Sequence, residues 1–351
     1  MRFLFCFLIS VSALAQVQQQ RMSDEQFKQM MEERKKLEFQ RNEERRINQL
    51  AKLNATNRPD TIKQLSFAKM NLKKIPRVVY RFKNLQNLDF SNNQISRLPR
   101  RLTRKLDSLH TLTMSFNPLK KIKFSENQHL KTLNLSTCQL QEWNPVFAKN
   151  RMLQLLILAN NHINTIPDNI SQLKTLRVLS LYNNKVSHLS PHIEQLEQLV
   201  EIDLYHNFLR EVPLSLCHLP KLATLALSYN SITTLPDEIG QMKSIVDLYL
   251  RDNGLQQLPQ SFGQLTTLKR VYFEANRFEQ FPVQLLDIQN IAEIDLSKNR
   301  LKTIPASVAN LTKLETLDLR QNPLTVNQEN SLIIRKLQKK GTQVQGFEVT
   351  E

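Results

Sequence analysis

The chain has 351 residues and a formal net charge of +16, with 48 Lys and Arg against 32 Asp and Glu. It contains only five glycines, which leaves no glycine-rich loop of the kind that cradles phosphate. Beyond the first residues, no stretch is apolar and long enough to span a bilayer as a helix. These features argue against a nucleotide-binding enzyme and against a membrane-embedded protein.

Residues 1–15 predict a secretory signal peptide. Met1 and Arg2 precede an apolar run that ends at residue 14, and Ala13 with Ala15 forms a small-residue cleavage site. The run is too short for a transmembrane helix. We therefore expect an exported protein, located in the periplasm, at the cell surface or outside the cell. The alternative is an apolar N-terminus that stays in the cytoplasm.

Residues 16–61 predict a charged helical segment or linker. Ser23 to Gln26 form a capping-box signature, and no proline occurs before Pro59, so one helix is expected from about Asp24 to Leu53. Its apolar stripe is thin and interrupted by charged residues, which argues against a coiled coil. The helix either caps the first repeat or stands as a solvated spacer, and the spacer is the favoured alternative.

From residue 62 to residue 326 the chain repeats the unit L-x-x-L-x-L-x-x-N-x-L. The Leu-x-Leu alternation is the period of a short strand with one buried face. Stacked units of this length form a solenoid, in which each coil buries its apolar face against its neighbours. The predicted fold is an α/β solenoid, an arc of about twelve coils with a concave parallel sheet. The units begin at Ile62, Leu85, Leu109, Leu130, Leu153, Leu176, Leu199, Leu222, Ile245, Leu268, Ile291 and Leu314.

The ninth position of the unit is polar, although it is predicted to point into the coil. A buried carboxamide is costly unless it is hydrogen-bonded, and here it can donate to and accept from backbone groups of neighbouring turns. We therefore predict a ladder of side-chain amides along the solenoid. Cys138 replaces Asn in the fourth unit and Met70 replaces it in the first. The ladder residues are Asn93, Asn117, Asn161, Asn184, Asn207, Asn230, Asn253, Asn276, Asn299 and Asn322.

The second half of the unit predicts an irregular outer side. An apolar residue occupies position 14, and in eight units a proline follows it directly. Proline fixes φ and lacks an N–H donor, so it suits turns or a short 3₁₀ stretch rather than a strand. With strands inside and slimmer turns outside, the sheet should be concave. The prolines are Pro76, Pro99, Pro167, Pro213, Pro236, Pro259, Pro282 and Pro305.

These positions resemble the 23-residue class of leucine-rich repeats, whose phrase is L-P-x-x-I-x-x-L-x-x-L-x-x-L-x-L-x-x-N-x-L. Residues 235–255, from Leu235-Pro236 to Asn253 and Leu255, reproduce it. Ras-suppressor-like and Scribble-like proteins and many bacterial repeat proteins belong to this class. The resemblance covers residues 62–326 and implies a protein-binding scaffold without catalysis. Animal extracellular members usually carry disulfide-knotted end caps, which are missing here, so the resemblance points to a bacterial exported protein.

Basic residues are concentrated in the first three units. Residues 62–131 hold 16 Lys and Arg against 3 Asp and Glu, whereas residues 132–351 hold 21 of each. Most are predicted on outer turns, where they could hold anionic polysaccharide, lipid headgroups or acidic protein; nucleic acid is the least expected ligand. The alternative is a solvated basic surface without a ligand. The predicted basic patch consists of Arg97, Arg100, Arg101, Arg104, Lys105, Lys120, Lys121 and Lys123.

Five of the six tyrosines occupy positions that are predicted to face the concave side. The register should place Tyr182 beside Tyr205 and Tyr249 beside Tyr272. Rigid aromatic rings and arginine are typical of binding hot spots. The preference of tyrosine for strands would account for one or two of the five, and sugar stacking on the rings stays open. The candidate partner-binding residues are Tyr182, Tyr205, His206, Tyr229, Tyr249, Arg251 and Tyr272.

No group of residues predicts catalysis, a cofactor or a metal site. The histidines are scattered, and His188 and His192 lack a carboxylate or cysteine that would complete a metal set. Cys138 and Cys217 lie three coils apart, on the order of 14 Å by strand spacing, which is beyond disulfide reach. Four carboxylates near the tyrosines are expected to be solvated with ordinary pKa values, namely Asp203, Asp247, Glu274 and Asp295.

Residues 327–351 are predicted to cap the last coil, because a terminal coil must hide its apolar edge from water. A helix is expected from Asn327 to Leu337, ending near Gly341, with a last strand at residues 344–349. The leading hypothesis is an exported, non-catalytic scaffold that binds a protein through the concave tyrosines. The alternative is a surface or envelope anchoring protein that binds anionic glycan or lipid through the basic patch.

Overall fold

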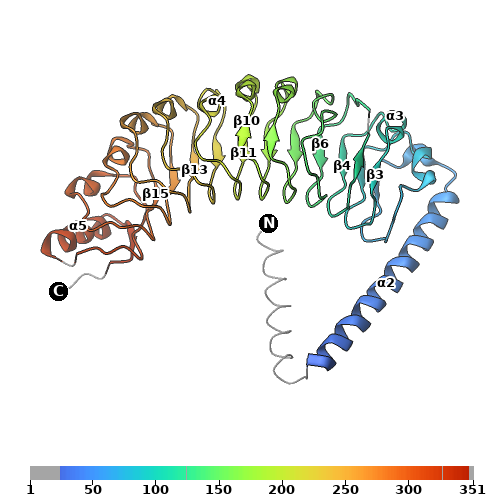
Figure 1. The fold of residues 1–351 in the computed structure, drawn as a ribbon, viewed down its shortest axis with the longest axis horizontal. Helices are drawn as coiled ribbons and strands as arrows, with labels where there is room; N and C mark the ends of the chain where they lie inside the picture. Colours follow the sequence, from blue (N-terminus) through green and yellow to red (C-terminus); the bar gives the residue numbers. More distant parts are fainter. Residues whose placement is uncertain (1–23, 124, 326, 348–351) are drawn as a thin grey trace.

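A computed structural model describes residues 24–123, 125–325 and 327–347. The chain forms one arch, with strands along its inner side and short helices and turns along its outer side (Figure 1). Helix α2 (Asp24–Asn54) extends away from the first coil, and helix α5 (Gln328–Lys339) lies at the last coil. The predicted signal peptide lies outside the described residues. No helix of the described part is long and apolar enough to cross a membrane.

Within the described residues, thirteen parallel strands form the concave sheet, which confirms the predicted solenoid fold. The register follows the repeat: Ile202 pairs with Leu179 and with Leu225, each 23 residues away. The strands are β1 (Gln64–Ser66), β2 (Asn87–Asp89), β4 (Thr111–Thr113), β6 (Thr132–Asn134), β7 (Leu155–Ile157), β9 (Val178–Ser180), β11 (Glu201–Asp203), β12 (Thr224–Ala226), β13 (Asp247–Tyr249), β14 (Arg270–Tyr272), β15 (Glu293–Asp295), β16 (Thr316–Asp318) and β17 (Gln343–Gln345).

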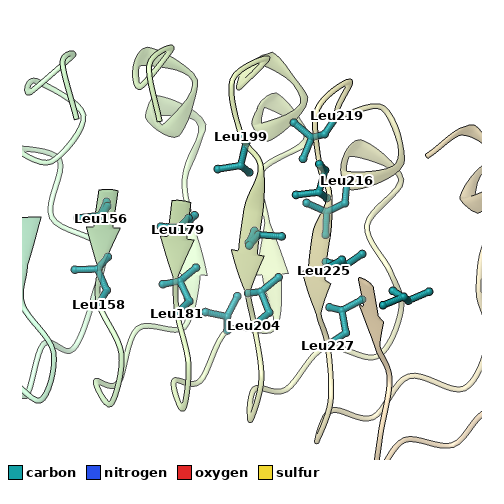
Figure 2. Close-up of a cluster of buried hydrophobic side chains, with 14 of the residues drawn as sticks. Leu156, Leu158, Leu179, Leu181, Leu199, Leu204, Leu216, Leu219, Leu225 and Leu227 are labelled. Atoms are coloured by element: carbon teal, nitrogen blue, oxygen red, sulfur yellow. The ribbon is translucent and has the colours of Figure 1, made fainter. Parts of the chain in front are cut away.

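The apolar residues of the repeat form one continuous core along the arch. The leucines of neighbouring coils lie behind the sheet in successive layers (Figure 2). Leu181, Leu204 and Leu227 occupy the same position in three successive coils, and each has 0% exposed surface. Because each coil packs only on its neighbours, the core is a row of similar layers rather than a closed centre.

The asparagine ladder is confirmed, and Asn207 shows its geometry. Its Oδ1 accepts a hydrogen bond from the backbone N–H of Val186 at 2.9 Å. Its Nδ2 donates to the carbonyl oxygens of Leu181 and Leu204, both at 3.0 Å. Each amide therefore satisfies buried backbone groups of its own coil and of the preceding coil, so that the ladder joins the coils.

The outer side consists of short helices and two small sheets. Prolines occupy the residue before several of these helices, for example Pro236 before η5, as the missing N–H of proline permits there. The helices are η1 (Pro59–Thr61), η2 (Arg77–Arg81), α3 (Arg101–Lys105), η3 (Asp168–Gln172), η4 (Pro191–Gln195), α4 (Leu214–Cys217), η5 (Asp237–Gln241), η6 (Gln260–Gln264), η7 (Val283–Asp287) and η8 (Ala306–Asn310). Strand β3 (Arg97–Leu98) pairs with β5 (Lys121–Ile122), and β8 (Thr165–Ile166) with β10 (His188–Leu189).

Helix α2 combines the two roles that the sequence left open. Its C-terminal end caps the first coil: Leu53 is buried, and Gln49 Nε2 donates to the carbonyl of Ser66 on strand β1 at 2.6 Å. The Arg81 guanidinium donates to the carbonyls of Asn54 and Thr56 at 2.8 and 3.0 Å. Most of the remaining helix is exposed, including Leu37. The spacer that the sequence favoured therefore describes only the exposed part of helix α2. The C-terminal end of this helix packs on the first coil instead, because the edge strand β1 has backbone groups that need hydrogen-bond partners.

The C-terminal cap consists of helix α5 and strand β17. Ile333, Ile334 and Leu337 of the helix are buried against the last coils. Strand β17 pairs with β16, which confirms a last strand here, but it begins one residue before the predicted range of 344–349 and ends at Gln345. The physical reason for its early end is Gly346, whose φ of +87° turns the backbone. Residues 348–351 lie outside the described part.

Candidate functional site

Two clusters of aromatic side chains lie on the concave sheet. The first cluster consists of Tyr182, Tyr205, His206 and Tyr229, and the second cluster of Tyr249, Arg251 and Tyr272. Tyr249 and Tyr272 end strands β13 and β14, where successive side chains alternate between the core and the concave face. The first cluster follows the strands, in turns where His206 and Tyr229 adopt φ values of 53° and 55°.

In the first cluster the rings pack on one another. Tyr182 and Tyr205 stack with ring centroids 5.3 Å apart and planes 18° from parallel. His206 stacks on Tyr229 at 4.4 Å, and Tyr205 contacts both of these rings, at 4.8 and 4.9 Å. Tyr182 and Tyr229 remain 37% and 38% exposed, so the cluster is packed from the sides and open to solvent on top.

The second cluster combines a stacked tyrosine pair with an arginine. Tyr249 and Tyr272 lie 4.7 Å apart between ring centroids, with planes 5° from parallel. The Arg251 guanidinium lies 4.7 Å from the centre of the Tyr272 ring, which is a cation–π distance. The Tyr272 hydroxyl donates to Glu293 Oε2 at 2.9 Å. These contacts hold both rings and the guanidinium in defined orientations before any partner arrives.

Ion pairs surround the second cluster. Arg251 Nη2 lies 3.0 Å from Asp295 Oδ2, and its Nε lies 3.6 Å from Glu274 Oε2. Lys298 Nζ lies 2.7 Å from Glu274 Oε1. Next to this network, between Arg251, Asp295 and Arg320, is a hollow of about 290 Å³. The concave face therefore presents alternating positive and negative groups beside the tyrosines.

The expectation of solvated carboxylates was wrong for three of the four residues. Asp247 and Asp295 are buried, with 9% and 7% exposed surface, because ion-paired arginines and neighbouring coils cover them. Burial raises the pKa of Asp203, although hydrogen bonds from the Tyr205 N–H and the Ser180 hydroxyl oppose the shift. Asp203 and Asp295 also accept the backbone N–H of the residue two positions later. These carboxylates hold turns and cations in place.

Arg251 of the second cluster also interacts with the coils that carry the first cluster. Its backbone N–H donates to Ser228 Oγ, in the preceding coil, at 3.0 Å. Burial raises the pKa of Tyr205, and the positive charge of Arg251 opposes part of this rise. The site residues predicted from the sequence thus lie together across strands β9 to β14. The sequence did not point to Glu293, Lys298 or Ser228 as members. Ser228 shares position 7 of the unit with Tyr205 and Arg251 in the adjacent coils, and Lys298 shares position 8 with Tyr229, three coils earlier. Glu293 is at position 3, which none of the predicted site residues occupies.

The basic patch lies apart from the two aromatic clusters. All eight of its residues are exposed, and they are located on strands β3 and β5, on helix α3 and in the adjacent turns. Arg101 is ordered by Tyr80, since its guanidinium lies 4.5 Å from the ring centre. Tyr80 is the one tyrosine outside the two clusters.

The described residues contain no group of three or more His, Cys, Asp or Glu that could hold a metal ion. Cys138 and Cys217 are free and buried. Burial raises the pKa of each thiol to about 12, so neither is a ready nucleophile near neutral pH.

Three family models match the chain. One described as a leucine-rich repeat region matches residues 214–339, one described as leucine rich repeat matches 151–209 and 176–232, and one described as two copies of leucine rich repeats matches 83–127. Together these matches cover more than half of the chain. A comparison with curated proteins found no match.

Solved structures of similar proteins include bacterial and plant proteins. A leucine-rich-repeat protein of Leptospira interrogans is 25% identical, with a TM-score of 0.63, and the alignment covers 81% of this chain and 84% of that one. An internalin of Listeria monocytogenes, 19% identical over 85% of this chain and 88% of its own, has a TM-score of 0.69 and shows the fold alone.

The ectodomain of the receptor kinase GASSHO1/SCHENGEN3 of Arabidopsis thaliana is 27% identical, with a TM-score of 0.62. The alignment covers 78% of this chain but only 34% of the ectodomain, so this chain spans about a third of its length. That structure was solved in complex with Casparian strip integrity factor 2.

Proposed function

This chain belongs to the leucine-rich-repeat family, and we propose that it is a non-catalytic scaffold that binds a protein partner on its concave sheet. The observation that carries the proposal is the pair of aromatic clusters on one sheet, in each of which the rings pack on one another. The Arabidopsis relative, which was solved with a bound protein factor, supports the same kind of role.

Preorganisation is the physical reason that this surface suits binding. Association normally loses free energy when flexible side chains become ordered. Here Tyr182 and Tyr205 already stack, and Tyr272 is held by both Arg251 and Glu293, so little order remains to be imposed. Tyrosine rings then supply a large contact area at low entropic cost.

The charges beside the rings favour a protein over a neutral sugar. Glu274 and Lys298 form an ion pair at the rim, with Lys298 exposed, and Arg320 lies one coil further along the sheet. Charged groups of both signs match the mixed side chains of a protein surface and fix the register of a complex. We therefore assign the rings to the contact centre and the ion pairs to its rim.

The first experiment replaces Tyr205 and Tyr249 with Ala and measures capture of the partner from the native cell fraction. Loss of a central anchor costs about 2 kcal/mol or more, which is roughly thirtyfold in affinity. The melting curve should change little, because both side chains project away from the core. Tyr80→Ala is the matched control, since it removes a tyrosine outside the concave sheet. Capture that survives the double change but fails after Arg100, Arg101 and Arg104 are reversed to Glu would assign binding to the basic patch instead.

A second experiment identifies the partner at the proposed face. A photo-crosslinking phenylalanine analogue is placed at Tyr229, or at the exposed outer position Lys149 as control. We expect a discrete adduct from position 229 alone, which mass spectrometry then identifies. Adducts that form only from position 149 would contradict binding on the concave sheet.

We also propose that the protein is exported. The support is the apolar run behind Arg2 and the small residues Ala13 and Ala15, in a chain that resembles exported bacterial repeat proteins. The test is the N-terminal sequence of the protein purified from its native source, which should begin at Gln16. An intact Met1 in the native protein would contradict export by this route.

A further inference from the structure

The basic patch carries charge that the fold itself does not neutralise. It consists of Arg97, Arg100, Arg101, Arg104, Lys105, Lys120, Lys121 and Lys123, and all eight are exposed. None of them forms an ion pair with another residue in the described part of the chain. Around the second cluster, by contrast, each arginine has a carboxylate partner.

Like charges in the patch are placed directly beside one another. Arg97 on β3 pairs in register with Lys121 on β5, so two cations lie on adjacent strands. On and beside helix α3, Arg100 and Arg104 are four residues apart, as are Arg101 and Lys105. Like charges opposite each other in a sheet, or four residues apart in a helix, are destabilising. The fold therefore carries a repulsion that an external anion would relieve.

The cations follow the axis of the solenoid. Lys74, Arg97 and Lys121 occupy position 13 in three successive coils, and all are exposed. Their neighbour at position 14 in the second coil, Leu98, points into the core, so position 13 points away from it, on the side opposite the concave sheet. Strand spacing separates Arg97 and Lys121, which lie on paired strands, by about 4.8 Å. The row ends at Glu142 in the fourth coil.

We propose that this patch binds a linear anionic polysaccharide, which lies along the coils with its acidic groups over the row of cations. A linear polymer fits a row, and its carboxylates or sulfates neutralise cations that form no ion pair within the described residues. The site is separate from the concave face. One chain of this length can therefore hold a polymer with its first coils and a protein with its later ones.

Two other polyanions fit the patch less well. A lipid surface is bound most firmly when apolar side chains insert beside the cations. In the described part of the first three coils the large exposed apolar side chain is Phe116, which follows strand β4 of the concave sheet and does not lie on β3, β5 or α3. Single-stranded nucleic acid is held by aromatic rings on which bases stack. The local aromatic ring, Tyr80, is already covered by Arg101.

The test compares two variants of equal net charge. The patch variant carries Arg97→Gln, Arg104→Gln and Lys121→Gln. The control variant carries Lys149→Gln, Lys185→Gln and Lys302→Gln, which removes three exposed cations outside the patch. Binding of the full chain to immobilised heparin is measured by surface plasmon resonance at several salt concentrations. Vesicles of phosphatidylcholine with phosphatidylglycerol, and single-stranded DNA, serve as competing probes.

We expect the patch variant to lose roughly tenfold in affinity for heparin and the control variant less than about twofold. Binding of the unchanged protein should weaken as salt rises. The melting temperature of the patch variant should stay the same or increase, because a like-charge pair is removed. Equal loss in both variants would mean that only net charge matters, and would overturn the proposal. Tighter binding to vesicles or DNA than to heparin at the same salt would overturn the choice of polysaccharide.

Discussion

Tyr205 and Tyr229 contact each other with ring centroids 4.9 Å apart, although they occupy different positions in their coils. Tyr229 belongs to a turn with a φ of +55°, which brings its ring beside that of Tyr205 on the neighbouring coil. Burial, followed by the interaction with the Tyr229 hydroxyl, raises the pKa of Tyr205 to about 12. The contact between the Tyr205 and Tyr229 side chains therefore also makes the Tyr205 phenol harder to deprotonate.

This shift predicts a stability loss in alkaline solution. Below the ordinary tyrosine pKa of 10.0 the phenol is protonated in both the folded and the unfolded chain, so its contribution to stability is fully present. As the pH rises from there toward about 12, the unfolded chain loses this proton while the folded chain keeps it. The unfolded state then binds fewer protons, and the free energy of unfolding falls.

Tyr205→Phe isolates this effect. Urea unfolding between pH 9 and 12 should show a shallower decline for the variant than for the parent protein. Phenolate absorbance should meanwhile show one fewer late-titrating tyrosine. Identical declines in the two proteins would show that Tyr205 titrates alike in the folded and unfolded chain.

Leu227→Ala tests the continuous core. Leu227 is fully buried between neighbouring coils, so truncation should lower the free energy of unfolding by roughly 2–5 kcal/mol. Leu214 is 50% exposed on the outer side, and Leu214→Ala should cost less than about 0.5 kcal/mol. Chemical denaturation of the two variants gives the comparison, and a similar cost for both would contradict the layered core.

Asn207→Leu tests the amide ladder. The change adds apolar surface but removes the hydrogen-bond partners of the Val186 N–H and of the Leu181 and Leu204 carbonyls. Leaving a buried polar group unsatisfied costs about 1–3 kcal/mol, so the melting temperature should fall. Asn164 is exposed, and Asn164→Leu is the control. An unchanged melting temperature for Asn207→Leu would count against the ladder as a source of stability.

Arg81→Ala tests the cap formed by helix α2. The guanidinium of Arg81 bonds carbonyls at the end of the helix, whereas Arg77, four residues earlier, has no such bond and provides the control substitution. Loss of hydrogen bonds from a charged group should loosen the cap by about 1.5–3 kcal/mol. Hydrogen exchange should therefore accelerate in residues 42–56 after Arg81→Ala and stay unchanged after Arg77→Ala. Equal exchange in both variants would mean that Gln49 and Leu53 hold the helix without Arg81.

The spacing of the repeat units predicted the register of strand pairing even where that spacing departs from 23 residues. The intervals around Leu109 are 24 and 21 residues, and Leu112 correspondingly pairs with Leu88 and with Leu133. The reason is local: each coil must place its leucines inside and its asparagine at the turn, so an insertion or deletion is absorbed in the outer turns. The same locality made Tyr182 a neighbour of Tyr205, because stacked strands place equal positions side by side.

By itself, the sequence determined the solenoid, its concave sheet, the buried asparagines and the neighbouring tyrosine pairs, because each depends on contacts between equal positions of adjacent coils. Only the tertiary structure decided the contacts between unequal positions. Arg251 reaches Asp295 two coils away, Tyr229 turns toward Tyr205, and Arg81 holds the end of helix α2. Such contacts depend on side-chain length, turn direction and mutual burial, none of which is encoded in a 23-residue period. They convert a row of similar coils into one surface with a particular arrangement of rings and charges.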